Sequence, residues 1–188
     1  MNKKDFRVKQ INALKEFSTD NRKMESKQIL DSLFQSESWK SAQTVATTLS
    51  DDLEFDTKPV IQQAQLENKI IVVPRTTIAG RKMFFNALTA NTQLERTKFG
   101  ILEPVGEDTV EPEQINLIVV PGLGFETKTG FRVGFGAGYY DRYLADYNGK
   151  TVGLAFTPQL LEKPEWPVDE FDIDLEQIIS KDGVVYEK

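Results

Sequence analysis

The sequence predicts an α/β protein, a single compact domain over residues 1–188 with a mostly parallel sheet flanked by helices on both faces. Two stretches support this prediction. Residues 44–49, 59–68 and 69–74 alternate as a β-branched strand, a helix and an apolar strand, which is the spacing of a βαβ unit. Residues 117–120 form another apolar run that ends at a proline and a glycine, as a buried strand does, before a glycine-rich loop and a helix. Such units pair their strands in parallel through a right-handed crossover and place helices against the sheet.

Two helices are predicted at the start of the chain. Residues 3–18 place Phe6, Ala13, Leu14 and Phe17 on roughly one helical face, and the first turns are basic. Cations oppose the helix dipole at an N-terminus, so they favour an anionic partner at this end. A second helix is predicted over residues 23–36, with Met24, Ile29, Leu30, Leu33 and Phe34 facing inward.

The remaining elements are shorter. Thr57 or Asp56 is a candidate cap for the helix 59–68, and Pro59 takes a tolerated first-turn position. Residues 89–113 are irregular, and we expect a long connection with short strand pieces. Further strands are predicted at 82–88, 151–156, 178–179 and 184–186, and a further helix at 139–147.

The overall composition excludes some partners. With 39% hydrophobic and 28% charged residues the chain is an ordinary globular protein, and its net charge is −6. Nucleic-acid binding relies on neutralising phosphates, so an acidic chain argues against it. The N-terminus lacks the apolar core of a signal peptide, and no apolar run approaches the ~20 residues of a membrane span. We therefore expect a cytoplasmic protein without a membrane or nucleic-acid partner.

The chain contains neither cysteine nor histidine. This excludes a disulfide, a thiol nucleophile, a Cys/His zinc site and an imidazole base. A metal ion would have to be held by oxygen ligands, which favours magnesium or calcium. Acid–base chemistry would fall to carboxylates, lysine, tyrosine or the substrate.

Three glycines alternate in the loop Gly134-x-Gly136-x-Gly138. The dinucleotide fingerprint needs its third glycine one position later, where this chain has Tyr139, and no Gly-Lys-Ser/Thr of a Walker motif follows. Backbone N–H groups in such a loop, beside a helix N-terminus, can still wrap an anion. Arg132 before the loop and Asp141 after it would suit a phosphate with its metal ion.

Taken singly, each of these features has a simpler explanation. The glycine loop can serve backbone geometry alone, with the two tyrosines as core and rim residues. Asp141 and Asp172 can be a cap or a solvated carboxylate, and Glu54 is one acid among several in its loop.

The order of the motifs is more specific than any one of them. Lys3 and Arg7 lie four residues apart, the loop 49–57 follows, and Val73-Pro74-Arg75 ends a strand. The block Pro121-Gly122-Leu123-Gly124-Phe125 then leads to Arg132-x-Gly134-x-Gly136-x-Gly138-Tyr139-Tyr140-Asp141. This order resembles the 5-formyltetrahydrofolate cyclo-ligase family, also called 5,10-methenyltetrahydrofolate synthetase, over nearly the whole chain. Residues 121–141 are highly specific, whereas the basic pair alone is weak.

The resemblance implies an ATP-dependent ring closure of a reduced folate, with Mg2+ as cofactor. We expect the protein to be a monomer or weak dimer. Arg132 and Tyr139 would act in catalysis, and Asp141 and Asp172 would hold the metal. The positions that would bind ATP are Lys3, Arg7, Arg132, Gly134, Gly136, Gly138 and Tyr140. The positions that would bind the folate are Leu49, Glu54, Phe135, Gly136, Ala137, Gly138 and Tyr139.

The chain departs from the family pattern in several places. Phe135 and Ala137 stand where relatives often have a basic residue or glycine, and Leu175-Glu176 replaces a common Val-Asp pair, so Asp169 or Asp174 are alternatives to Asp172. Thr76 stands where some relatives have an aromatic residue, which leaves Phe84, Phe99 or Tyr139 as candidates for stacking on the pterin.

The implied mechanism suits a chain without histidine or cysteine, because the substrates supply the nucleophiles and leaving groups. Two other hypotheses remain at this point. One is a non-catalytic nucleotide- or folate-binding module on the same scaffold, motivated by Phe135, Ala137 and Glu176. The other is a sugar-phosphate isomerase-like enzyme, which rests on fold analogy alone.

Overall fold

The computed structural model describes residues 1–51, 53–97, 100–106 and 108–188. Phe99, one of the candidates for pterin stacking, lies outside the described residues. Within the described chain, the main sheet has eight strands in the order β13-β12-β10-β7-β1-β2-β3-β6. These are β1 (Thr44–Ala46), β2 (Ile70–Thr77), β3 (Lys82–Ala87), β6 (Thr109–Val110), β7 (Leu117–Val119), β10 (Lys150–Leu154), β12 (Gln177–Ser180) and β13 (Gly183–Glu187).

The centre of this sheet is parallel and its edges are antiparallel. β12, β10, β7, β1 and β2 pair in parallel, and in register Val45 lies opposite Ile71 on one side and Leu117 on the other. β13 at one edge and the β3–β6 pair at the other run antiparallel to their neighbours. The prediction of a mostly parallel sheet is therefore confirmed. The helix between β1 and β2, α4 (Lys58–Leu66), completes the predicted βαβ unit.

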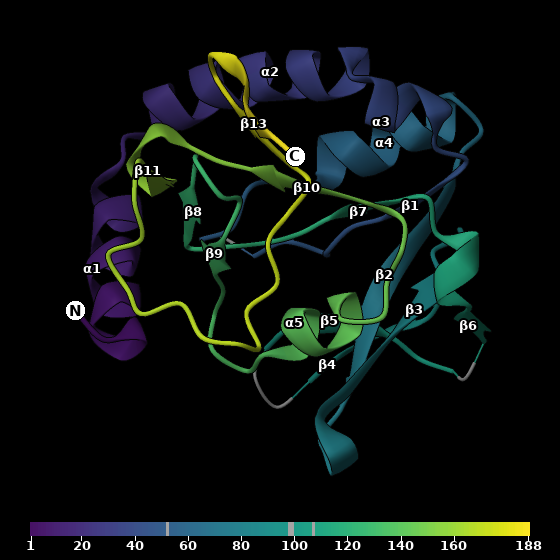
Figure 1. The fold of residues 1–188 in the computed structure, drawn as a ribbon. Coiled ribbons are helices and arrows are strands. Elements are labelled where there is room, and N and C mark those ends of the chain that lie inside the picture. Colours follow the sequence, from purple (N-terminus) through teal and green to yellow (C-terminus); the bar gives the residue numbers. More distant parts are fainter. Residues whose placement is uncertain (52, 98–99, 107) are drawn as a thin grey trace.

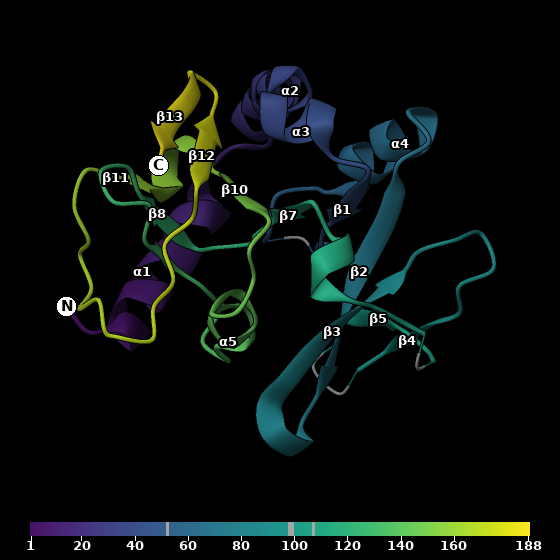
Figure 2. The same ribbon diagram turned by 45° about the vertical axis from the view of Figure 1, so that its right-hand side comes forward.

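Helices cover both faces, and the strands alternate their side chains between two cores. α1 (Lys3–Glu16), α2 (Thr19–Gln35), α3 (Glu37–Ser41) and α4 pack on one face, and α5 (Tyr139–Leu144) packs on the other (Figures 1 and 2). In β1, Val45 belongs to the first core and Ala46 to the second. This two-residue period is expected of a strand buried on both faces, and it explains the continuous apolar runs in the sequence.

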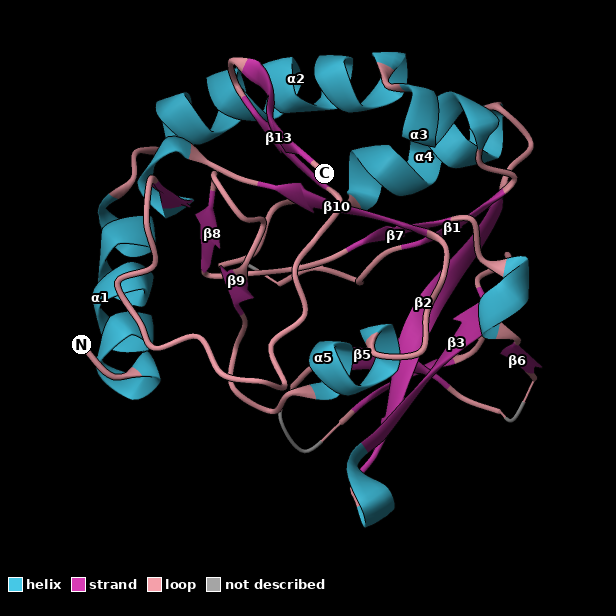
Figure 3. Cartoon of the chain, in the orientation of Figure 1, coloured by secondary structure: helices cyan, strands magenta, loops and turns pink. Residues whose placement is uncertain are grey.

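Smaller elements lie outside the main sheet. A second sheet has the order β11-β8-β9, with bounds Leu160–Leu161, Gly124–Glu126 and Arg132–Val133, and a two-stranded hairpin joins β4 (Leu94–Arg96) to β5 (Leu102–Pro104). Figure 3 shows how much of the remaining chain is loop around these strands. Short 3-10 helices occupy Ala79–Arg81, Pro112–Gln114 and Thr157–Gln159. No helix among the described residues has both the length and the apolar composition needed to cross a bilayer.

The second helix confirms the inward positions of Ile29, Leu30, Leu33 and Phe34 but differs from the prediction at its start. It begins at Thr19, four residues earlier than predicted, and Met24, predicted to face inward, is 55% exposed. Glu25 faces inward instead and is 3% exposed. The Thr157 backbone N–H and hydroxyl donate to its carboxylate at 2.8 and 2.6 Å, so a buried acid fixes the start of a 3-10 turn. A hydrophobic pattern could not reveal this polar contact.

Other boundaries also moved. The first strand ends at Ala46 rather than at residue 49, the first helix at Glu16 rather than 18, and the last predicted helix at Leu144 rather than 147. α3 was not predicted, and its Trp39 is fully buried in the core beside Phe34.

Candidate active site

The carboxyl ends of β1, β7 and β10 lie next to one another in the sheet. Loops that follow such strand ends are the usual place for ligands in open α/β sheets. A cavity at this edge is lined from three connections, those after β1, β7 and β10. Its lining residues are Thr48, Glu54, Phe55, Thr57, Val119, Val120, Pro121, Gly122, Leu154 and Gln159.

A buried arginine lies on β9, beside the glycine loop. Arg132 is 3% exposed, and its Nη1 lies 2.8 Å from Oδ1 of Asp141 on α5. Its Nε is buried and has no partner among the described residues. An unpaired buried N–H is costly, so this side chain has unused capacity to donate to an anion.

Two further charges lie close to this pair. The backbone N–H of Ile173 donates to Asp141 Oδ1 at 3.3 Å, which brings the first turn of α5 next to the segment that carries Asp172. Lys3, at the start of α1, donates to both oxygens of Asp172 at 2.6 and 2.7 Å. Two cations, Lys3 and Arg132, and two carboxylates, Asp141 and Asp172, therefore lie close together although they come from four segments.

Of the alternatives to Asp172, one shares its partner and the other does not. Asp169 accepts from Lys3 at 2.7 Å, whereas Asp174 pairs with Lys188 at 2.9 Å. Burial tends to lower the pKa of the Lys3 ammonium, but the hydrogen bonds to Asp169 and Asp172 outweigh it and leave the pKa raised. Lys3 is therefore fully charged near neutral pH.

The glycine loop is held by α1. Arg7 Nε donates to the carbonyl oxygen of Gly134 at 2.8 Å. A Cβ on Gly136 would lie 3.3 Å from the guanidinium carbon of Arg7, and Gly136 has a φ of 113°, so a side chain here is unfavourable in two ways. Phe135, Gly136 and Ala137 are exposed at the loop's surface.

A buried tyrosine, Tyr140, and a glutamate, Glu54, complete the site. The Tyr140 hydroxyl is buried without a partner among the described residues. Burial and the negative charge of Glu54 raise its pKa, and the charge of Arg132 lowers it, so this hydroxyl lies within the fields of both. The pKa of Glu54 is itself raised to about 7, chiefly by burial, with a smaller contribution from the charge of Asp51.

Comparison with known proteins decides the family. A model of the 5-formyltetrahydrofolate cyclo-ligase family matches residues 1–181. The chain belongs to the 5-formyltetrahydrofolate cyclo-ligase family. This confirms the resemblance drawn from the motifs and places the chain in a family of ligases that act in folate one-carbon metabolism.

Individual cyclo-ligases give the same result. The chain is 28% identical to the mouse 5-formyltetrahydrofolate cyclo-ligase over 194 residues, which is 96% of this chain and 94% of the mouse protein. It is 33% identical to the Escherichia coli K12 cyclo-ligase over 150 residues, 76% of this chain and 80% of that protein.

Solved structures of this family share the fold. The Aquifex aeolicus 5,10-methenyltetrahydrofolate synthetase, determined by NMR, matches with a TM-score of 0.82 and 30% identity, covering 98% of this chain and 92% of that one. The Mycoplasma pneumoniae 5,10-methenyltetrahydrofolate synthetase matches with a TM-score of 0.75 and 22% identity, covering 96% and 99%, and supports the fold alone.

The structure brings together most of the positions that the cyclo-ligase pattern assigned to ATP and metal. Lys3, Arg7, Arg132, Asp141 and Asp172 come from four separate segments, and hydrogen bonds connect each of these segments to the glycine loop or to one another. Of the folate positions, Glu54 is linked to this group through Tyr140, because the charges of Glu54 and Arg132 both act on the pKa of the Tyr140 hydroxyl. Leu49, the other loop position, packs partly buried against the first core.

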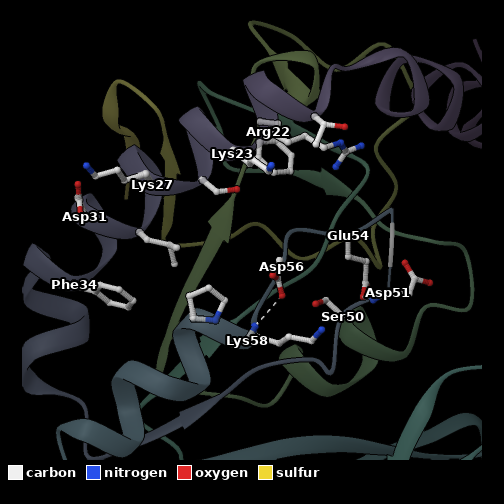
Figure 4. A pocket seen from close by; sticks show the side chains of 15 residues that line it. Arg22, Lys23, Lys27, Asp31, Phe34, Ser50, Asp51, Glu54, Asp56 and Lys58 are labelled. Atoms are coloured by element: carbon white, nitrogen blue, oxygen red, sulfur yellow. Dashed lines mark hydrogen bonds between the residues drawn. The ribbon is translucent and has the colours of Figure 1, made fainter.

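A larger pocket of about 650 Å³ lies between α2 and the loop after β1, and sequence reasoning did not anticipate it. Figure 4 shows basic side chains of α2, among them Lys23 and Lys27, across from acids of the loop. Glu54 lines this pocket and the smaller cavity, so it forms part of the wall between them. None of the positions assigned to ATP or metal lines the larger pocket.

The acids suit a magnesium ion that is shared with a substrate. Among the described residues, three or more acids never gather in one place as a closed metal site would require. Mg2+ instead is commonly bound through one or two carboxylates, water and substrate phosphates. Asp141 and Asp172, on adjoining segments, match that pattern.

Proposed function

We propose that this chain catalyses the ATP-dependent closure of 5-formyltetrahydrofolate to 5,10-methenyltetrahydrofolate, releasing ADP and phosphate. The observation that carries the proposal is the arrangement of Lys3, Arg7, Arg132 and the glycine loop around one place at the carboxyl edge of the sheet. Family membership supplies the chemistry of the reduced folate, and the cationic surroundings of the loop supply the reason to expect a nucleotide.

Charge placement supports the phosphoryl-transfer part of the proposal. Enzymes of this class work mainly by positioning and by neutralising the transferred group. Arg132 precedes the glycine loop, and its Nε has no partner among the described residues, while the Arg7 guanidinium contacts the loop at Gly134 and Gly136. Each can donate to phosphate oxygens while its other nitrogen keeps the contact that fixes the loop or α5.

Asp141 and Asp172 are the residues that we expect to hold Mg2+, which would offset the negative charge of the β- and γ-phosphates. In the structure both carboxylates are neutralised by cations, Asp141 by Arg132 and Asp172 by Lys3. If phosphate oxygens replaced the carboxylates as partners of Arg132 and Lys3, the two carboxylates would become available to bind the metal.

The reaction needs no protein nucleophile. The formyl oxygen of the folate attacks the γ-phosphorus, a new P–O bond forms, and the bond to the β-phosphate oxygen breaks to leave ADP. Nitrogen-10 then attacks the activated formyl carbon, loses its proton, and expels phosphate as the ring closes. Arg132 would stabilise the charge on the transferred group, and Tyr139 would hold the folate against the loop. Glu54 would accept hydrogen bonds from the pterin edge.

A spectrophotometric assay tests this proposal. Folded protein supplied with 5-formyltetrahydrofolate and MgATP should produce the methenyl absorbance, and omission of either ATP or Mg2+ should abolish it. Binding of both ligands by calorimetry without turnover would instead indicate a non-catalytic module. Turnover that is indifferent to ATP would contradict the proposal outright. The proposal also includes that the protein is a monomer or weak dimer in the cytoplasm and that the whole chain forms one domain.

A further inference from the structure

Arg142, on α5, contacts two other segments at the rim of the site and one ring of its own helix. Its Nη2 donates to the carbonyl oxygen of Ala137 in the glycine loop at 2.7 Å. Its Nε donates to the carbonyl oxygen of Arg81, at the tip of the β2–β3 hairpin, at 3.1 Å. The same guanidinium lies 5.5 Å from the centre of the Tyr139 ring.

These contacts fix the direction of the loop's peptide groups. In a trans peptide the C=O and the following N–H point in opposite directions. By holding the Ala137 carbonyl, Arg142 therefore also directs the Gly138 N–H to the opposite side. In the same way Arg7 holds the Gly134 carbonyl and directs the Phe135 N–H. The loop is thus clamped at both ends by guanidinium groups, one from α1 and one from α5.

The hairpin tip needs a similar restraint. Gly80 and Arg81 both have positive φ, 76° and 49°, and for a non-glycine residue such a backbone is held only by its surroundings. The hydrogen bond from Arg142 to the Arg81 carbonyl helps to hold this backbone conformation, and it connects the hairpin tip to the helix that begins at Tyr139. Loop, ring and hairpin tip are therefore set relative to one another by one side chain.

We propose that Arg142 is a positioning residue of the cyclo-ligase, and this inference rests on the proposed function. Its guanidinium orients the N–H groups of the glycine loop toward the transferred phosphoryl group, and it holds the Tyr139 ring and the hairpin tip as the wall against which the folate lies. Arg142 itself does not touch the reacting atoms.

Lys69 provides a matched control on the opposite edge of the sheet. Its ammonium also bridges two backbone carbonyls, those of Trp39 and Ala42, at 3.0 and 2.7 Å, and lies 5.4 Å from an aromatic ring centre, that of Trp39. It precedes the first residue of β2, whereas the site lies where the parallel strands end. Lys69 also pairs with Glu67 at 3.4 Å, but the two side chains otherwise make the same kinds of contact, and only Arg142 makes them at the site.

The kinetic test compares Arg142→Met with Lys69→Met in the full-length protein. Arg142→Met should lower kcat/KM for both substrates about tenfold or more, because small misplacements of reacting groups carry large penalties. Lys69→Met should lower the thermal midpoint and leave kcat and both KM values unchanged. Arg142→Lys should recover part of the loss, since Lys69 shows that an ammonium can bridge two carbonyls.

A second measurement does not depend on turnover. In ¹⁵N-labelled protein without ligands, the amide signals of Gly136, Gly138 and Tyr139 should shift or broaden in Arg142→Met and stay in place in Lys69→Met. Unchanged loop amides in Arg142→Met overturn the inference, as does a kcat/KM within twofold of wild type in an active enzyme. If the wild-type protein has no activity, the proposed function fails, and the amide signals still decide the role of Arg142.

Discussion

Glu54 lies half-buried in the loop after β1, and its carboxyl pKa is raised to about 7. Burial is the main cause, and the charge of Asp51 adds to it. Because the folded pKa exceeds the ordinary value of 4.5, the folded state binds the extra proton between these two pH values. Stability contributed by the neutral carboxyl group is therefore present below about pH 4.5 and is lost as the pH rises through about 7.

This gives a prediction for Glu54→Gln. The amide removes the cost of an ionised, half-buried carboxylate, so the variant should gain stability relative to wild type at pH 8 and lose that gain at pH 4.5. Thermal unfolding at both pH values measures it. The folate KM should rise in the variant, and in wild type it should rise as the pH falls through about 7. A constant difference between the two midpoints would contradict the pKa assignment.

Arg132 is the residue whose loss should separate nucleotide binding from folate binding. It is buried and paired with Asp141, so Arg132→Met leaves a carboxylate uncompensated and should lower the free energy of unfolding by about 3 kcal/mol. We also expect the KM for ATP to rise about tenfold or more, with a smaller change for the folate. Steady-state kinetics on the folded fraction test this, and Arg132→Lys, which keeps the charge, is the control. Equal effects on both substrates would make Arg132 structural.

At the scale of elements, the glycine loop links β9 to α5 through backbone shapes that side chains disfavour. Gly136 and Gly138 have φ values of 113° and 67°, and a Cβ on Gly138 would lie 3.0 Å from Arg142 Nη1. Gly134 differs, because its φ is not in the positive range and a Cβ there would meet nothing within 4 Å. The three glycines therefore have different structural roles despite their regular spacing.

This difference can be measured with alanine substitutions. Gly136→Ala should lower the free energy of unfolding by about 1–3 kcal/mol and abolish most activity, because the backbone must leave its present φ. Gly134→Ala in the same loop is the matched control and should stay close to wild type in both. Chemical denaturation and the methenyl assay provide the measurements. Equal losses in the two variants would show that the loop tolerates another backbone conformation.

Across the whole molecule, the site joins the two ends of the chain. Lys3 and Lys9 of α1 contact Asp172, Asp169 and Glu165 of the segment between β11 and β12, while Arg132 and Asp141 come from the middle of the sequence. A ligand that replaces the acids on Lys3 must rearrange contacts between segments more than 100 residues apart. Ligand binding should therefore be visible in global stability.

MgATP should raise the thermal midpoint of wild type, with about 2.7 kcal/mol gained at a ligand concentration 100 times the Kd. The shift should shrink in Asp141→Asn and depend on a higher Mg2+ concentration. ATP with EDTA measures the part that needs no metal. If Asp141→Asn keeps the wild-type Mg2+ dependence, Asp141 does not belong to the metal site. Asp174→Asn is the control, because Asp174 pairs with Lys188 and not with the cations of the site.

The sequence by itself determined the parallel sheet, the two-sided core and the family. Those features repeat along the chain as apolar runs, turn residues and an ordered motif block, so local patterns are enough to predict them. The glycine loop and its neighbours, Arg132 and Asp141, were also visible, because they lie within ten residues of one another.

Only the tertiary structure decided which charges meet. The pairing of Lys3 with Asp172, the inward turn of Glu25, the field of Glu54 at Tyr140 and the clamp made by Arg142 each join residues through space. Polar contacts of this kind leave no periodic signal in the sequence, since a charged residue on a helix has the same letter whether it faces water or a buried partner. The fold supplies the partner, and with it the chemistry.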